Sequence, residues 1–341
     1  MTDYSASAVI GFCVEGYCMK VIWKELCTAI LMGAVLPGLI LNVSAILLRS
    51  HAQELPIMES VPETRNITEI HTPVWIRFPD RGKEQVELDT YLVGVVLAEM
   101  PAEFETEALK AQAVAARTYT AKAMKTGGKH GDGSVCTNAS CCQAYIAEDT
   151  YLSEGGTEEN LEKVRNAVLN TSGYVLTYEE ELIEATYFSC SGGSTEEAAA
   201  VWGTDYPYLR AVSSPGEETA AHFSDTVCFT AAQFQEKTGC SLTGDPAGWF
   251  ETEAYTPGGG IDTIVICGKR YTGVQLRQML GLPSTAMTIS TEGDTIKIVT
   301  RGYGHRVGMS QYGADAMAVT GCNFIEILAH YYPGTELSRL T

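Results

Sequence analysis

Residues 89–128 read DTYLVGVVLAEMPAEFETEALKAQAVAARTYTAKAMKTGG, and this stretch predicts two successive helices. Asp89 is a favourable N-cap for the first helix, and Pro101 stops that helix because proline cannot continue it. The second helix runs from about Thr106 to Met124 and is rich in Ala, Leu, Gln and Lys, which are strong helix formers. Gly127-Gly128 then closes it. A paired helical layer is therefore expected early in the chain.

One acidic side chain of the first helix lies on its apolar face. The positions that share this face are Leu92, Val95, Val96 and Glu99. Burial and the negative end of the helix dipole both raise the pKa of a carboxyl group there. A glutamic acid that keeps its proton near neutral pH suits a general acid. The alternative is a structural carboxylate paired with Arg117 of the second helix.

The rest of the chain mixes strands and helices without regular alternation, which favours an α+β fold over a doubly wound sheet. Strands are expected at Val74–Phe78, Gln85–Leu88, Tyr174–Tyr178, Leu182–Phe188, Ile261–Cys267, Met287–Ser290 and Thr295–Thr300. Further helices are expected at Leu161–Thr171, Ala231–Lys237, Val274–Leu280, Ala314–Val319 and Phe324–His330. Residues 129–160 read as an irregular polar segment.

The first fifty residues belong to a different physical class. Leu26–Leu48 carries no charge and is long enough to cross a bilayer as a helix. Basic residues on both sides give a weak bias towards a cytoplasmic N-terminus, residues 1–25. A cleaved signal peptide is the alternative, but the apolar run exceeds an ordinary signal core, so an uncleaved anchor at 26–48 is expected.

The other boundaries follow from this anchor. Residues 1–18 are a candidate mis-assigned extension, because Met19–Lys24 resembles the natural start of an exported protein. Residues 49–72 read as a linker, and 73–341 as one extracytoplasmic domain.

The charge balance excludes one class of partner. The 341 residues carry a formal net charge of −19, so the chain lacks the basic footprint that nucleic acid requires. Eleven cysteines are many for a cytosolic protein, but their odd number does not make a closed disulfide framework.

Three residues of the irregular segment form a candidate metal site. His130, Cys136 and Cys142 follow one another at intervals of six residues, and such nitrogen and sulfur ligands suit zinc. Cys141 is an alternative ligand or a disulfide partner. The competing interpretation is that these loop cysteines form disulfides, as they often do in exported proteins.

Two glycine-containing segments supply further candidate residues. Arg301–Ala314 reads RGYGHRVGMSQYGA, and its close backbone approach can line a cleft or form a tight structural turn. Ser189–Gly193 reads SCSGG at the end of a predicted hairpin strand and by itself favours a turn.

Taken together, these motifs resemble the family of stage II sporulation protein D, which also includes the amidase enhancer of vegetative cell walls. The resemblance covers roughly residues 72–337, and it is carried, in chain order, by Leu97–Pro101, Ala108–Tyr119, Ser189–Gly193, Gly302–Ala314 and His330–Thr335. It implies a glycan-binding cleft and a lytic transglycosylase of peptidoglycan. The expected substrate is a glycan strand stripped of its peptides by a partner amidase, stage II sporulation protein P, during engulfment.

The resemblance also implies roles for single residues. Glu99 matches the catalytic acid of the family. The positions expected to bind or orient the glycan are Arg117, Tyr187, Ser189, Ser191, His305 and Gln311. The sequence departs from the family pattern at Phe188 and Cys190, where many members carry His and Thr, and at Arg306, where glycine is usual.

Three functions therefore compete. The first is the membrane-anchored enzyme, placed on the mother-cell side of the engulfing septum and working with other engulfment membrane proteins. The second is a non-catalytic glycan-binding module that activates an amidase. The third is a zinc-stabilised scaffold. The position of Glu99 on an apolar stripe favours the first, because a binding module does not need that carboxyl.

Overall fold

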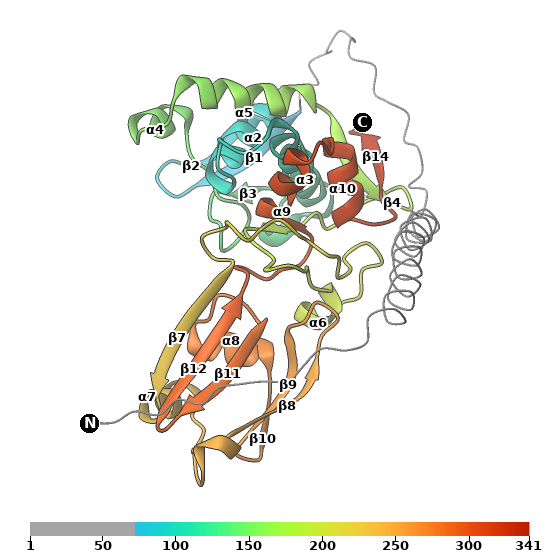
Figure 1. Ribbon diagram of the computed structural model, residues 1–341. Helices are drawn as coiled ribbons and strands as arrows, with labels where there is room; N and C mark the ends of the chain where they lie inside the picture. The colour runs from blue at the N-terminus through green and yellow to red at the C-terminus, as the bar shows by residue number, and fades with distance from the viewer. Residues whose placement is uncertain (1–71, 341) are drawn as a thin grey trace, which may run out of the picture. The chain divides into compact units, whose positions relative to one another are not determined.

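The computed structural model describes residues 72–340 (Figure 1). These residues form a mixed α+β structure, as the sequence predicts. Within this range, no helix combines the length and the hydropathy needed to cross a membrane. The expected span at 26–48 and the expected linker lie outside the described residues.

The buried apolar residues gather in two clusters, and the larger one contains both helices of the opening stretch. Strands β1 (Pro73–Phe78) and β2 (Gly82–Glu87) form an antiparallel hairpin that pairs Pro73 with Glu87 and Phe78 with Gly82. Helix α2 (Leu88–Glu99) follows directly, and α3 (Thr106–Thr126) packs against it. Gly127 ends α3 at φ +89°, a backbone conformation that glycine adopts without strain.

The remaining elements around this first core come from the parts of the chain before residue 224 and after residue 301 (Figure 1). They include the helices α4 (Glu148–Ser153), α5 (Glu158–Asn170), α9 (Gln311–Val319) and α10 (Phe324–Tyr331). The sheet order is β14-β4-β5, with strands β4 (Tyr174–Tyr178), β5 (Glu181–Leu182) and β14 (Glu336–Arg339). Shorter elements are η1 (Gly128–His130), β3 (Val135–Cys136), β6 (Tyr187–Phe188), α6 (Ala198–Trp202) and β13 (Met309–Ser310).

The second core is built by residues 224–301. Its two antiparallel sheets have the orders β11-β12-β7 and β10-β9-β8. The strands are β7 (Ser224–Thr230), β8 (Phe250–Tyr255), β9 (Ile261–Ile266), β10 (Lys269–Thr272), β11 (Met287–Glu292) and β12 (Thr295–Arg301). The helices are α7 (Ala231–Thr238), η2 (Pro246–Gly248) and α8 (Gly273–Leu280).

Two of the sequence-based expectations about elements are wrong. The expected strand Leu182–Phe188 is interrupted, because only its ends pair: Leu182 pairs with β4 and Tyr187–Phe188 pairs with β13. The segment 129–160 is not irregular throughout, because it contains β3 and α4. Strands β7, β8 and β10 were not expected.

A buried ion pair joins α2 to α3. Arg117 is fully buried, and its Nη2 lies 2.8 Å from Oδ1 of Asp89. The guanidinium also donates to the carbonyl oxygens of Val168 and Thr171 at the end of α5, at 3.0 and 2.8 Å. Burial lowers the pKa of Arg117, and Asp89 opposes that shift. Asp89 therefore acts through its ion pair and not as the expected N-cap, because the N-cap is Glu87.

We predict that Arg117→Met destabilises the protein by about 3–5 kcal/mol, because it removes the charged partner of the Asp89 carboxylate and one donor from each of two buried carbonyl groups. The measurement is the free energy of unfolding in denaturant. Arg165→Met is the matched control, since Arg165 makes a half-exposed ion pair with Glu148 and should cost about 1 kcal/mol or less. Equal losses in the two variants would contradict this role.

Candidate functional site

A cavity of about 550 Å³ lies at the end of α2, beside the loop that follows α3. Its walls include three of the candidate catalytic and glycan-binding residues, Glu99, Tyr187 and His305. Other side chains at the cavity are Tyr119, Lys129, Cys141, Cys142, Gln143, Glu184, Trp202 and Tyr206. The site is thus assembled from segments that are distant in the sequence.

Glu99 is the last residue of α2 and is partly buried at the cavity wall. The predicted apolar stripe of α2 is confirmed, because its other members, Leu92, Val95 and Val96, are fully buried. Burial raises the pKa of the Glu99 carboxyl above its ordinary value, and a hydrogen bond from the backbone N–H of Ala144 opposes this shift. Glu99 makes no ion pair within residues 72–340. It is therefore not paired with Arg117, as the alternative interpretation required.

The loop that supplies the Ala144 donor is held against α2 by a close backbone approach at Gly94. The N–H of Ile146 donates to the carbonyl oxygen of Gly94 at 3.1 Å. A Cβ atom at position 94 would lie 2.4 Å from the ring of Tyr145. Gly94 therefore lets this loop reach the helix and places Ala144 on Oε1 of Glu99, at 2.5 Å.

Tyr187 reaches the cavity within a fixed hydrogen-bond chain. Its hydroxyl accepts from Nε2 of Gln143 at 2.9 Å, and Oε1 of Gln143 accepts from the hydroxyl of Thr120 at 2.8 Å. Burial raises the pKa of Tyr187 well above its ordinary value, and the charge of Glu99 adds to this. The phenol is therefore neutral. Because the hydroxyl oxygen of Tyr187 accepts from Gln143, the proton of that hydroxyl can be donated to another group.

His305 presents a neutral ring to the same cavity. Burial lowers its pKa to about 4, and the charges of Arg277 and Lys129 add to the shift. Nδ1 accepts a hydrogen bond from the backbone N–H of Val307 at 3.1 Å, so the proton of the neutral ring is on Nε2. The ring centroid lies 5.3 Å from that of Trp202.

The other expected glycan-binding residues do not line this cavity. Arg117 is fully buried in the ion pair with Asp89. Ser191 is also fully buried, and its hydroxyl donates to Glu217 at 2.8 Å. Gln311 is buried at the start of α9. Ser189 is partly buried, and its carbonyl oxygen accepts from the N–H of Tyr312 at 3.0 Å. Arg117 and Ser191 are completely buried, so neither side chain is exposed at this cavity.

A buried carboxylate explains the SCSGG turn. Oε2 of Glu217 accepts from the hydroxyl of Ser191 and from the N–H groups of Ser191 and Gly192, at 2.8–2.9 Å. Oε1 accepts from the hydroxyls of Ser214 and Ser310. The turn and the start of α9 are thus tied to one side chain, as the structural interpretation of this motif requires. No signal in the sequence marks Glu217.

Arg306 has a comparable structural role. Its φ of +64° explains why glycine is favourable at this position. The side chain is buried and donates to the carbonyl oxygens of Ser191, Ser194 and Gly258 at 2.7–2.8 Å. It is not among the residues at the cavity.

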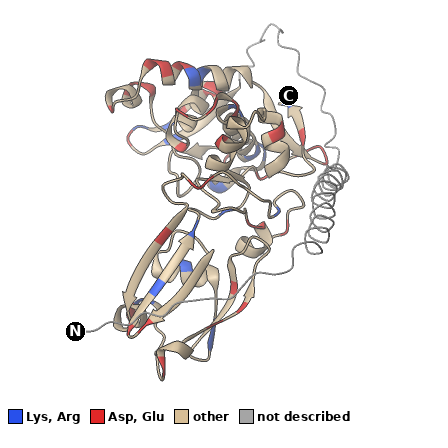
Figure 2. Ribbon diagram, in the orientation of Figure 1, with Lys and Arg blue, Asp and Glu red and all other residues tan. Residues whose placement is uncertain are grey.

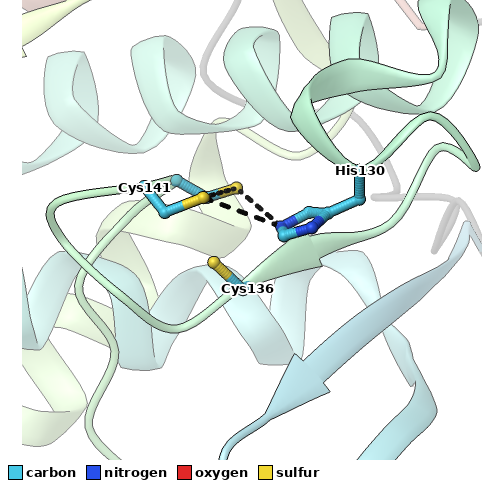
Figure 3. A group of neighbouring side chains, drawn as sticks. His130, Cys136 and Cys141 are labelled. Atoms are coloured by element: carbon cyan, nitrogen blue, oxygen red, sulfur yellow. Dashed lines mark hydrogen bonds between the residues drawn. The ribbon is translucent and has the colours of Figure 1, made fainter.

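The predicted metal ligands lie together with Cys141 beside the cavity (Figure 3). The ligand atoms of His130, Cys136, Cys141 and Cys142 all lie within 4.8 Å of one another. Nε2 of His130 is 3.6 Å from Sγ of Cys142 and 3.8 Å from Sγ of Cys141. All the cysteines among residues 72–340 are free thiols, so the disulfide interpretation is not supported there. These four side chains could hold a metal ion.

Sequence reasoning missed several residues at the cavity. Gln143 and Ala144 lie beside the predicted ligand Cys142, so their position next to a candidate site was a usable signal. Trp202 and Tyr206 lie in a segment with no recognised motif, and only the tertiary structure brings them to Glu99.

We predict that Glu99→Gln raises the free energy of unfolding at pH 7. A folded pKa above the ordinary value means that ionisation of Glu99 favours the unfolded chain as the pH rises above about 4.5. The glutamine has no charge to bury and keeps an oxygen that can accept from Ala144. Denaturant unfolding at pH 7 and pH 4.5 measures the difference, which should shrink at the lower pH. A variant less stable than the parent at pH 7 would contradict the burial of this carboxyl.

The chain is similar to proteins of known name over most of its length. It is 41% identical to stage II sporulation protein D of Bacillus subtilis (strain 168) over 282 residues, which cover 81% of each chain. It is 41% identical to stage II sporulation protein D of Bacillus amyloliquefaciens over 275 residues, 79% of each chain.

A more distant relative is the amidase enhancer of Bacillus subtilis (strain 168). It is 31% identical over 305 residues, which cover 72% of this chain and 40% of the enhancer. A family profile described as stage II sporulation protein matches residues 81–178, which contain Glu99 and the four residues of the His/Cys cluster. This chain belongs to the stage II sporulation protein D family.

Proposed function

We propose that this sporulation protein is a lytic transglycosylase that cleaves peptidoglycan glycan strands stripped of their peptides. The observation that carries the proposal is the Glu99 carboxyl, which lies at a 550 Å³ cavity with a raised pKa and no ion pair among the described residues. A cavity of this size suits a ligand of a few sugar rings. A carboxyl with a raised pKa at its wall suits general acid catalysis.

The reaction needs one residue in two roles. Glu99 donates its proton to the glycosidic oxygen as the bond from that oxygen to C1 of muramic acid breaks, and the bonding electrons leave with the oxygen. The resulting carboxylate then takes the proton of the 6-hydroxyl of the same sugar, whose oxygen bonds to C1. The product is a 1,6-anhydro ring, and Glu99 regains its proton. The N–H of Ala144 stabilises the carboxylate between the two steps.

Tyr187 and His305 supply neutral hydrogen-bond donors. The hydroxyl of Tyr187 already accepts from Gln143, so its proton can be given to a sugar oxygen. His305 carries its proton on Nε2, because Nδ1 accepts from Val307. Neither group adds a positive charge that would favour loss of the proton from Glu99 in the resting state.

The four residues of the His/Cys cluster would hold zinc. One imidazole and three thiols are the ligand set of structural zinc sites. Burial alone would raise the pKa of Cys136, but hydrogen bonds from Asn138, His130 and the neighbouring cysteines lower it to about 7, which favours a thiolate ligand. Bound zinc would cross-link the loop between α3 and Ala144, and this loop carries the N–H donor to Glu99.

The remaining expectations complete the proposal. The substrate strands would be supplied by an amidase of the stage II sporulation protein P type, and engulfment membrane proteins would be the other partners. The chain would be held in the cell membrane by residues 26–48, with residues 73–341 outside the cytoplasm on the mother-cell side of the septum.

A second candidate function is a glycan-binding module that activates an amidase without cleaving glycan. The similarity to the amidase enhancer favours it. The two candidates differ in whether Glu99 is needed, because stimulation of an amidase requires no protonated carboxyl at the cavity. A zinc-stabilised scaffold of the engulfment machinery is a third outcome.

We predict that the purified full chain releases products ending in 1,6-anhydromuramic acid from denuded glycan strands, and that Glu99→Gln lowers the rate by about 10²–10⁴-fold. Mass analysis of the products measures both. The rate should fall as the pH rises through the pKa of Glu99, because the ionised form has no proton to donate.

Glu184→Gln is the matched control, because Glu184 is the other carboxylate at this cavity and pairs with Lys122 at 2.8 Å. Retained cleavage in that variant supports a single acid. Reducing-end products that need both carboxylates would indicate a hydrolase with water as acceptor. No cleavage by the folded chain, together with amidase stimulation by Glu99→Ala, would establish the second candidate.

We predict that the full chain, purified without chelator, contains about one zinc ion per molecule. Cys136→Ser should lose most of this zinc, whereas Cys228→Ser should retain it, because Cys228 is exposed and lies outside the cluster. Elemental analysis gives the metal content. Zinc-free parent protein would overturn the assignment.

A further inference from the structure

Aromatic rings continue from the cavity onto the neighbouring surface. Trp202 at the cavity is 43% exposed, and its ring is 5.3 Å from that of His305. Two residues before His305 lies Tyr303, which is 46% exposed and stacks on His222 with ring centroids 4.6 Å apart. Exposed aromatic rings next to a candidate glycan cavity offer apolar faces on which a pyranose ring can pack.

A basic residue lies against the same segment. Arg277 of α8 donates through Nε to the carbonyl oxygen of Leu282 at 3.2 Å. The next residue, Pro283, accepts from the N–H of Gly304 at 3.1 Å. These two bonds bring the side chain of Arg277 near Gly304, which lies between Tyr303 and His305. Consistent with this placement, the charge of Arg277 helps to lower the pKa of His305, and Tyr303 opposes the lowering of the pKa of Arg277 by burial.

Arg277 makes no ion pair among the described residues. Its side chain is partly buried, and this burial lowers its pKa. By contrast, Arg117 and Arg306 each face a carboxylate, Asp89 and Glu196. The Nη atoms of Arg277 form no hydrogen bond within residues 72–340. A partly desolvated guanidinium with free donors is suited to bind an anion in a bidentate manner.

The acidic character of the chain bears on the role of Arg277. The chain carries −19, and Figure 2 shows acidic residues along α4, α5 and the strands of the second core. The cavity itself contains Glu99, whose carboxyl has a raised pKa, Glu184, which pairs with Lys122, and the cation Lys129. Lys129 donates to the carbonyl oxygen of Cys141, so part of its donor capacity is already used. An anionic ligand would therefore need a local cation such as Arg277.

We propose that Arg277, Tyr303 and His305 form a subsite for a sugar that carries a carboxylate, with the ring packed on the aromatic side chains and the carboxylate held by the guanidinium. The inference rests on the proposed function. In a peptide-stripped strand the lactyl group of muramic acid ends in a free carboxylate, whereas in a peptide-bearing strand it ends in a neutral amide. Arg277 would thus distinguish strands from which the peptides have been removed.

The test compares two probes that differ only in this charge. Short denuded glycan strands are used as the free acid and after conversion of their carboxylates to methylamides. Binding is measured by calorimetry on the full chain carrying Glu99→Gln, which prevents cleavage during the titration. This protein should bind the free acid at least tenfold more tightly than the methylamide, and adding Arg277→Gln should remove that preference. Adding Tyr303→Ala should weaken both probes alike.

Lys297→Gln is the matched control, because Lys297 is an exposed cation on β12 outside the subsite. It removes the same charge and should leave the preference intact. Arg277→Lys keeps the charge but not the planar fork, so an intermediate preference is expected even if the glutamine variant is poorly folded.

The outcomes separate this subsite from the proposed function. An unchanged preference in both Arg277 variants, or the same loss in Lys297→Gln, would overturn the role of Arg277 alone. Absence of binding of either probe by the folded chain would overturn the subsite together with the proposed glycan substrate. Cleavage that depends on Glu99, with equal affinity for the two probes, would overturn the subsite and leave the enzyme.

Discussion

The buried guanidinium of Arg117 is the constraint on which the position of the candidate acid depends. It joins Asp89 near the start of α2 to the carbonyl groups at the end of α5, and α2 ends ten residues after Asp89, at Glu99. With its beginning held in this way, α2 presents its last side chain to the cavity. The contact at Gly94 then brings the Ala144 donor to the same carboxyl. A residue that resembles a substrate ligand in sequence is therefore a positioning residue in the structure.

A second network of buried polar groups explains the structural role of the two glycine-containing motifs. Glu217 holds the SCSGG turn and the start of α9, while Arg306 joins that turn to the carbonyl oxygen of Gly258 in the part of the chain that builds the second core. Buried charges of this kind need several partners, and both have them. The motifs of the family thus include residues that maintain the frame of the cavity as well as residues, such as His305, that face it.

The sequence predicted what local patterns determine. The two opening helices, the buried stripe leading to Glu99, and three members of the His/Cys cluster follow from spacing along the chain, and the structure contains them. The fourth member, Cys141, was expected only as an alternative ligand or a disulfide partner. The donors Gln143 and Ala144 depend on how one loop folds, which spacing does not reveal. The motif match assigned Arg117 and Ser191 to glycan binding, but such a match carries no information on burial. Both side chains are fully buried in the structure. Trp202 reaches the cavity, and Glu217 reaches the SCSGG turn, only through long-range packing.

The central claim is that this fold raises the pKa of one carboxyl group at the wall of a cavity, where that group is proposed to act as the acid on glycan. The most direct measurement is an NMR titration of the side-chain carboxyl of Glu99 in the folded chain, with Glu99→Gln used to assign its signal. The account predicts a pKa clearly above the ordinary value for glutamic acid, about 4.3, because burial outweighs the single hydrogen bond from Ala144. A pKa at or below that value would contradict it, since Glu99 would then be ionised and could not act as the acid.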